Sequence, residues 1–136
     1  MKRREFIAIS GAALLTPTLI SARTIDYSPG ILQPALDNGE TVFLDFKASW
    51  CTTCAAQERV INALKAENPA YEAQITFINV DWDDYGRSSL VQSLNIPRRS
   101  TLVVLDGRRE LGRIVAGTSR TVIKDLMDTA LAAASA

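Results

Sequence analysis

The pattern of apolar and polar positions along the chain predicts five strands. Two of these segments are almost entirely apolar, as is typical of strands that are buried on both faces. Two others flank Asp106-Gly107, a dipeptide that favours a tight hairpin turn. The predicted strands cover residues 23–28 (a short strand or an extended lead-in), 41–47, 75–80, 101–105 and 110–116.

Four helices are predicted between and after these strands, because apolar residues recur there with the period of one helix face. The last helix is expected to be capped by Ser119, and the alanine-rich end of the chain, residues 132–136, is expected to fray. The predicted helices cover residues 29–36, 55–67, 87–94 and 119–131. The predicted buried faces of the second and fourth helices are Ala56, Val60, Ile61 and Leu64, and Val122, Ile123, Leu126, Met127 and Ala130.

This alternation of strands and helices, followed by a terminal hairpin and helix, indicates an α/β domain. Parallel crossover connections come first and antiparallel pairing follows, so a mixed central sheet with helices on both faces is predicted. The 136 residues suit one domain, and 47% of them are hydrophobic, which is enough for a substantial core.

The first 22 residues have the composition of an export signal. Lys2, Arg3 and Arg4 form a basic start, and the mostly apolar stretch over residues 6–20 is too short to span a membrane. We therefore predict a signal peptide over residues 1–22, followed by a mature domain that is exported to the periplasm by the twin-arginine or the Sec route. An uncleaved N-terminal anchor is the alternative.

Charge and composition exclude several classes of function. The formal net charge is zero, so nothing in it indicates nucleic acid as a partner. The chain has no histidine, which excludes His-based catalysis and His-containing metal sites. Its two cysteines are too few for a zinc or iron–sulfur site with four protein ligands, so no metal and no other cofactor is predicted.

Those two cysteines, Cys51 and Cys54, lie where a predicted strand passes into a predicted helix. A disulfide across so short a loop adds little stability, because the chain entropy that it removes grows with loop length. At the start of a helix, however, unpaired N–H groups and the helix dipole favour a thiolate. We therefore predict that Cys51 is the attacking sulfur and that Cys54, one turn inside the helix, resolves the mixed disulfide.

The segment 42–54 resembles the active-site segment of the thioredoxin superfamily. The acid in the strand, Asp45, the tryptophan before the first cysteine, Trp50, and the CxxC spacing all match. The Thr52-Thr53 dipeptide differs from the Gly-Pro of thioredoxin and is closer to the C-terminal domain of the membrane thiol reductase DsbD and other bacterial envelope members. The resemblance covers roughly residues 31–131 and implies a thioredoxin-like fold and protein disulfide exchange.

Asp45 and Trp50 are predicted to assist the two cysteines. A carboxyl in the middle of a buried strand should have a raised pKa, so we expect Asp45 to accept and return the proton of Cys54, as the resemblance also implies. Thioredoxin pairs this acid with a lysine on the following strand, where this chain has Phe77, so that help is expected to be absent. Trp50 is predicted to pack beside the thiols, to shield them and to contact the substrate.

The loop before the fourth strand departs from the family pattern. Ser100 stands where thioredoxins carry a cis-proline that faces the cysteines, and Ser100 and Thr101 are the predicted substrate-binding residues of this loop. A cis bond before a residue other than proline costs about 2.5–4 kcal/mol, so we expect a trans Arg99–Ser100 bond. In an alternative register Pro97 is the cis-proline, followed by Arg98.

Two charged stretches lie near the predicted site. Arg98-Arg99 contacts an acidic partner, stabilises the Cys51 thiolate or remains solvated, and the pattern alone leaves these alternatives open. Asp81, Asp83 and Asp84 are expected to form a solvated turn, since they lack the remaining positions of a calcium-binding loop.

Together these residues predict an exported, monomeric thiol–disulfide oxidoreductase with Cys51 and Cys54 as its redox-active disulfide. Its expected partners are substrate proteins with disulfides or thiols and a membrane or soluble redox protein. The CxxC dipeptide lacks the histidine of strongly oxidising relatives, which favours a reductase or electron carrier. The alternative is a binding module on the same scaffold, or a Cu(I) chaperone, without turnover.

Overall fold

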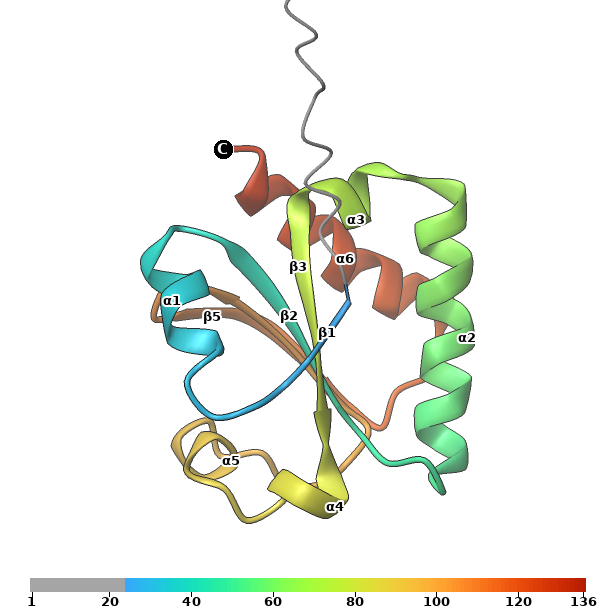
Figure 1. The fold of residues 1–136 in the computed structure, drawn as a ribbon. Helices are drawn as coiled ribbons and strands as arrows, with labels where there is room; N and C mark the ends of the chain where they lie inside the picture. The colour runs from blue at the N-terminus through green and yellow to red at the C-terminus, as the bar shows by residue number, and fades with distance from the viewer. Residues whose placement is uncertain (1–23) are drawn as a thin grey trace, which may run out of the picture.

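The computed structural model describes residues 24–136, which form one five-stranded sheet with helices on both faces (Figure 1). The strand order is β1-β3-β2-β4-β5; β3 pairs in parallel with β1 and β2, whereas β4 pairs antiparallel with β2 and β5. The predicted α/β fold with a mixed sheet is confirmed. The strands are β1 (Ile25–Asp26), β2 (Thr41–Lys47), β3 (Ile75–Asp81), β4 (Thr101–Asp106) and β5 (Arg109–Val115).

The helices cover the two faces of the sheet in two groups. Figure 1 shows α2, α3 and α6 on one side and α1 and α5 on the other, with α4 at the end of β3. The helices are α1 (Leu32–Asp37), α2 (Thr52–Glu67), α3 (Ala70–Gln74), α4 (Trp82–Tyr85), α5 (Ser89–Ser93) and α6 (Arg120–Ala134). In the part of the chain that the structure describes, none of these helices is long and apolar enough to cross a membrane. The predicted signal peptide, residues 1–22, lies outside that part.

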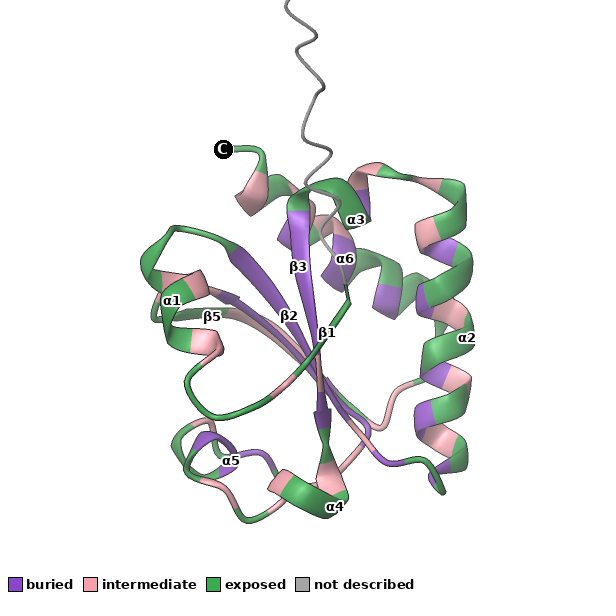
Figure 2. Cartoon of the chain, viewed as in Figure 1, coloured by how far each residue is buried: buried purple, intermediate pink, exposed green. Residues whose placement is uncertain are grey.

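Strand β2 contributes to both cores because its side chains alternate between the faces of the sheet. Phe43 packs against α2, α3 and α6, whereas Leu44 and Phe46 pack against α1 and α5. Figure 2 shows most of β2 and β3 in purple, the colour of buried residues. Asp45 follows Phe43 on the α2 face, so the alternation that builds the core also turns this carboxyl inward.

Three differences from the predicted elements have local causes. Helix α2 begins at Thr52, three residues before the range given by the apolar pattern and in agreement with the prediction that Cys54 lies inside the helix, because the Cys51 sulfur accepts a hydrogen bond from the Cys54 N–H and caps the first turn. The stretch predicted as a solvated turn forms α4 instead, capped by the Asp81 carboxylate on the Asp83 N–H. The C-terminal residues predicted to fray continue α6 to Ala134.

A further short helix, α3, was not predicted, because Asn68-Pro69 indicated only the end of α2. There the Asn68 side-chain oxygen accepts a hydrogen bond from the Ala70 N–H and starts the new helix. Two predicted buried faces are also corrected. Gln57 is buried in α2 where Ala56 was predicted, and Val122 of α6 is exposed.

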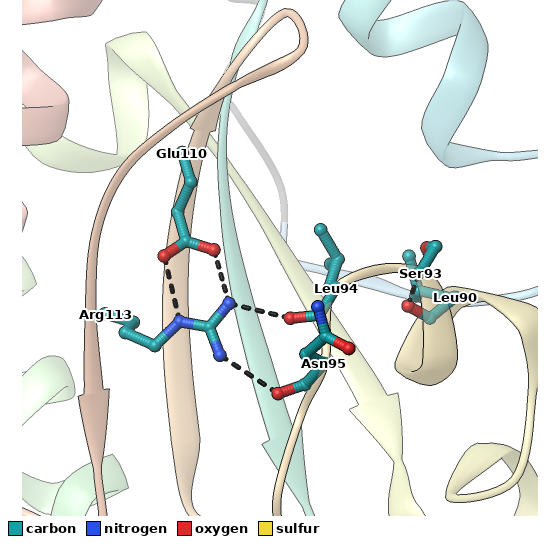
Figure 3. A network of polar contacts seen from close by, with 6 residues as sticks. All are labelled: Leu90, Ser93, Leu94, Asn95, Glu110 and Arg113. Atoms are coloured by element: carbon teal, nitrogen blue, oxygen red, sulfur yellow. Dashed lines mark hydrogen bonds and ion pairs between the residues drawn. The ribbon is translucent and has the colours of Figure 1, made fainter.

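Arg113 of β5 is hydrogen-bonded to the loop between α5 and β4, as Figure 3 shows. Its guanidinium donates hydrogen bonds to the carbonyls of Leu94 (2.8 Å) and Asn95 (3.2 Å) and to both carboxylate oxygens of Glu110. These bonds to Arg113 hold the pKa of Glu110 below its ordinary value. Because this loop runs on to Ser100, Arg113 supports the site from outside it.

We expect Arg113→Met to lower the free energy of unfolding by about 1–3 kcal/mol, because two loop carbonyls and a carboxylate lose a charged donor. Arg109→Met is the matched control on the same strand. Arg109 is 77% exposed and its nitrogen lies 3.8 Å from the Asp106 carboxylate, so its loss should change stability by about 0.5 kcal/mol or less. Urea titration of both variants measures the difference, and equal losses would contradict the role given to Arg113.

Candidate active site

Cys51 and Cys54 form a disulfide at the N-terminus of α2. Cys51 is the residue before the first helical turn, and its sulfur lies 3.1 Å from the Cys54 backbone nitrogen, which donates to it. The Cys51 residue is 5% exposed and Cys54 is 1% exposed, so Cys51 is the more accessible of the two. This arrangement places Cys51 where the helix favours negative charge, as predicted from the sequence.

The Ser100 hydroxyl lies between the two sulfurs. Its oxygen is 3.1 Å from the Cys51 sulfur and 3.1 Å from the Cys54 sulfur, and the residue is fully buried. Within residues 24–136 the structure has no cis peptide bond, so the expected trans Arg99–Ser100 bond is confirmed and the alternative register with a cis bond before Pro97 is wrong.

The backbone of Ser100 is in the left-handed region, with φ +64°. Such a conformation costs about 1–3 kcal/mol for a residue other than glycine and persists only where surrounding contacts hold it. Here the Ser100 N–H donates to the Phe46 carbonyl (2.7 Å), and the Ser100 carbonyl accepts from the Ala116 N–H (2.9 Å). Thr101 is also fully buried, and its hydroxyl donates to the Arg98 carbonyl at 2.7 Å. Neither side chain is exposed to a substrate in this conformation, and a substrate contact at Ser100 or Thr101 stays a prediction.

Gln57 is a site residue that the sequence did not indicate. It is fully buried in α2, and its side-chain nitrogen donates to the carbonyls of Ser100 (2.9 Å) and Gly117 (3.0 Å). It therefore joins the helix that carries the cysteines to the two loops that face them. The only signal in the sequence is the position of Gln57, three residues after Cys54, where a helix presents the same face again.

Trp82, for which the sequence suggested no role, packs against the cysteines, whereas Trp50 is exposed. Trp50 is 56% exposed, so the prediction that it shields the thiols is wrong. Its indole N–H donates to both oxygens of the Asp83 carboxylate (3.0 and 3.1 Å), and the Arg99 guanidinium lies 4.5 Å from its ring centroid. Trp82 of α4 instead packs against the cluster of Ala48, Cys51 and Cys54. The exposed Trp50 remains available to contact a substrate.

Asp45 is buried in the middle of β2, and its Oδ1 atom has no hydrogen-bond partner within the described residues. Burial raises the pKa of Asp45 to about 7, and the Glu58 charge adds to this, while Lys47 and Lys65 oppose it. A carboxyl with this pKa can both accept and release a proton near neutral pH. The raised pKa was predicted from the sequence.

Two lysines at other positions, Lys47 and Lys65, influence the pKa of Asp45, although β3 has no lysine at the position of Phe77. Phe77 occupies that position, and the Lys65 ammonium of α2 lies 4.0 Å from its ring centroid. Lys47, at the end of β2, forms an ion pair with Glu58 at 3.0 Å. Lys47 and Lys65 both lower the pKa of Asp45 from these other positions, and the expected absence of proton-transfer help from a lysine on β3 stays a prediction.

Two cavities lie on the α2 side of the disulfide. One, of about 550 Å³, is lined by both cysteines, and the other, of about 220 Å³, is lined by Asp45. They share Lys47, Glu58 and Asn79 in their walls. The cavity at the sulfurs and the cavity at the carboxyl are therefore neighbours, with polar side chains in the walls that they share.

The thioredoxin family profile matches residues 28–129 of the chain. A thioredoxin H-type of Fagopyrum esculentum is 29% identical over 97 residues, which cover 71% of this chain and 78% of that protein. Among solved structures, Trxlp from Edwardsiella tarda superposes with a TM-score of 0.66 at 27% identity, over 76% of this chain and 98% of that one. The thioredoxin of Malassezia sympodialis superposes with a TM-score of 0.61 at 20% identity, over 80% of this chain and 95% of that one, and shares the fold.

The free energy of unfolding should fall as the pH rises from about 4 to about 7, because over this range the folded chain keeps a proton on Asp45 that the unfolded chain has lost. Each pKa unit corresponds to about 1.4 kcal/mol, so the whole effect is on the order of 4 kcal/mol. Asp45→Asn lacks this dependence, and its stability relative to the native chain should therefore increase by that order between pH 4 and pH 8. Urea titrations at a series of pH values measure it, and a constant difference between the two proteins would contradict the assignment.

Proposed function

Since this chain belongs to the thioredoxin family, we propose that it reduces disulfide bonds of substrate proteins, as a reductase or electron carrier of the periplasm. Thiol–disulfide oxidoreductase activity itself follows from the family and from the Cys51–Cys54 pair. The observation that carries the proposal is the placement of this pair at the N-terminus of α2, after the strand that buries an acid with a pKa of about 7.

In the reduced protein, the Cys51 thiolate attacks one sulfur of a substrate disulfide. A new bond forms between Cys51 and that sulfur, the substrate disulfide breaks, and the other substrate sulfur leaves as a thiolate. The first turn of α2 stabilises the attacking charge, because the Cys54 N–H donates to the Cys51 sulfur. The exposed Trp50, held by Asp83 and Arg99, supplies an apolar surface beside the reacting bond.

Cys54 then resolves the mixed disulfide. Its thiol gives its proton to the Asp45 carboxylate, by way of water in the two cavities that share lining residues, and attacks the Cys51 sulfur. The bond to the substrate breaks, and the second substrate sulfur leaves and takes up a proton. Two electrons have passed from the protein dithiol to the substrate disulfide, and the protein ends as the Cys51–Cys54 disulfide of this structure.

Two features support a reducing role outside the cytoplasm. The dipeptide between the cysteines is Thr52-Thr53, without the histidine of strongly oxidising relatives. The family match begins at residue 28, after the basic and apolar stretch that reads as an export signal. In an oxidising compartment such a dithiol needs an electron donor, so we propose a membrane or soluble redox partner in addition to the substrate proteins.

Reduction of insulin disulfides by the purified domain, with dithiothreitol as electron donor, tests the function. The native domain should accelerate insulin precipitation, and Cys51→Ser should abolish the acceleration, because it removes the attacking sulfur. Cys54→Ser should stop turnover but retain a mixed disulfide that mass spectrometry detects.

The reduction potential of the Cys51–Cys54 pair tests the direction. For a reductase it should lie near that of thioredoxin, about −270 mV; a value near about −120 mV, as in a strong oxidant, would contradict the reducing role. Cu(I) binding without insulin reduction would favour the chaperone alternative.

Export is tested with the full chain in a bacterial host that has a periplasm. We expect the periplasmic fraction to contain a chain that begins at or near Arg23, as determined by mass spectrometry of the intact protein. The double variant Arg3→Lys/Arg4→Lys keeps the charge and distinguishes the routes, because only twin-arginine export depends on the arginines. An uncleaved chain in the membrane fraction would support the anchor instead, and an uncleaved chain in the cytoplasmic fraction would overturn the proposal.

A further inference from the structure

We propose that Ser100 is a catalytic residue of the exchange reaction, whose hydroxyl donates a hydrogen bond to the Cys51 thiolate and accepts one from the Cys54 thiol, and that Gln57 is its positioning residue. The inference rests on the thiol–disulfide exchange described above but not on its direction or location. It therefore survives if the reducing role or the export proposal fails.

The geometry of the Ser100 hydroxyl fits the reduced protein better than the oxidised one. A hydroxyl has one proton to donate and two lone pairs to accept with, so it can serve a thiolate and a thiol at the same time. In this structure its oxygen lies at 3.1 Å from each sulfur and, among residues 24–136, no other group is within hydrogen-bond distance of it. Disulfide sulfurs are weak acceptors, whereas a thiolate is a strong one.

The burial of Ser100 makes the difference between a disulfide sulfur and a thiolate as acceptor important. Ser100 is fully buried, so its hydroxyl cannot turn to water when the cysteines form a disulfide. A buried donor without a good acceptor is destabilising, and a hydrogen bond to a charged group stabilises more than one to a neutral group. Both contributions favour the reduced pair in which Cys51 is ionised and Cys54 is protonated. Ser100 thus adds a second donor to the Cys51 sulfur, in addition to the Cys54 N–H.

Gln57 holds the Ser100 backbone in the conformation that this contact needs. The left-handed φ of +64° is maintained by bonds at both polar atoms of the backbone, and Gln57 supplies one of the two donors to the carbonyl. The same side-chain nitrogen donates to Gly117, so its two N–H bonds are directed to two different loops. Because Gln57 is on the helix of the cysteines, it fixes the distance between the hydroxyl and the sulfurs.

In the reaction, Ser100 keeps its proton throughout. The hydroxyl donates to the Cys51 thiolate before attack, and the negative charge then passes to the leaving sulfur of the substrate. When Cys54 loses its proton to Asp45, the hydroxyl can turn to donate to the new Cys54 thiolate, since both sulfurs are at the same distance. One hydroxyl therefore serves both half-reactions.

Ser100→Ala should raise the pKa of Cys51 by about 1–2 units, a 10- to 100-fold fall in its ionisation constant, because the thiolate loses a charged hydrogen bond. The reduction potential should become more negative by about 30 mV for each factor of ten, because the reduced form is destabilised. Thiolate absorbance at 240 nm against pH measures the first quantity, and equilibration with dithiothreitol at a pH above the pKa of the native protein measures the second.

Ser100→Gly separates the hydroxyl from the backbone, because glycine adopts φ +64° without strain and also lacks the hydroxyl. It should show the same pKa shift as Ser100→Ala. Thr101→Val is the matched control, since it removes a buried hydroxyl from the next residue without touching the sulfurs. It should leave the thiolate titration unchanged. An equal shift in Thr101→Val, or no shift in both Ser100 variants, would overturn the catalytic role.

Gln57→Met tests the positioning role with a side chain of similar length that cannot donate. It should raise the pKa of Cys51 less than Ser100→Ala does, and it should add nothing in the Ser100→Ala background, because Gln57 acts through the serine. Additive shifts in the double variant would show that Gln57 affects the sulfurs by another route and would remove it from the proposal. Unfolding in urea, followed for each variant, shows whether the titrated protein is folded.

Discussion

Strand β2 is hydrogen-bonded along its length to β3 on one side and to β4 on the other, and the active site depends on this two-sided pairing. The register sets Asp45 between Asn79 and Leu102, in the middle of the sheet, where water is largely excluded. The end of the same strand leads to Cys51, and its Phe46 carbonyl holds the Ser100 N–H. One strand therefore positions the acid, the first turn that carries the cysteines and the loop that faces them.

The parts of the fold that the sequence predicts are those encoded locally. The apolar run of residues 41–47 and the CxxC before a helical pattern each lie within one stretch of chain, so their structure and chemistry could be predicted from spacing. Gln57 and Trp82 act through contacts with residues that are far away in the sequence. Their amino-acid types and their immediate neighbours indicated exposed positions instead. A polar Gln57 beside Ala56 suggests an exposed position, and Trp82 stands among aspartates that suggest a solvated turn. The sequence could have indicated that Asp81 caps a helix through the Asp83 N–H, because aspartate is a common cap. It could not indicate that Trp82 packs on the cysteines.

Serine in place of proline changes how the loop before β4 is held. A proline has φ fixed near −65° and no N–H, so it can neither adopt the φ of +64° at Ser100 nor donate to the Phe46 carbonyl. This chain stabilises the loop by hydrogen bonds to the Ser100 backbone, including one from the buried Gln57, and by the Arg113 contacts with Leu94 and Asn95. Since both polar backbone atoms of Ser100 are bonded, a substrate strand can pair with them only by displacing an existing partner.

The pKa of Asp45 depends first on burial and then on three charged side chains. Burial alone pushes the pKa of this group upward, and Glu58 pushes it further. Lys47 and Lys65 oppose both effects from β2 and α2, and the balance leaves the pKa at about 7. Without these lysines the pKa of Asp45 would be higher, so at neutral pH the carboxyl would more often be protonated already and unable to take the proton of Cys54. Lys47 and Glu58 also line the cavity at the sulfurs, so two of the charges that act on the pKa of Asp45 border the cysteines as well.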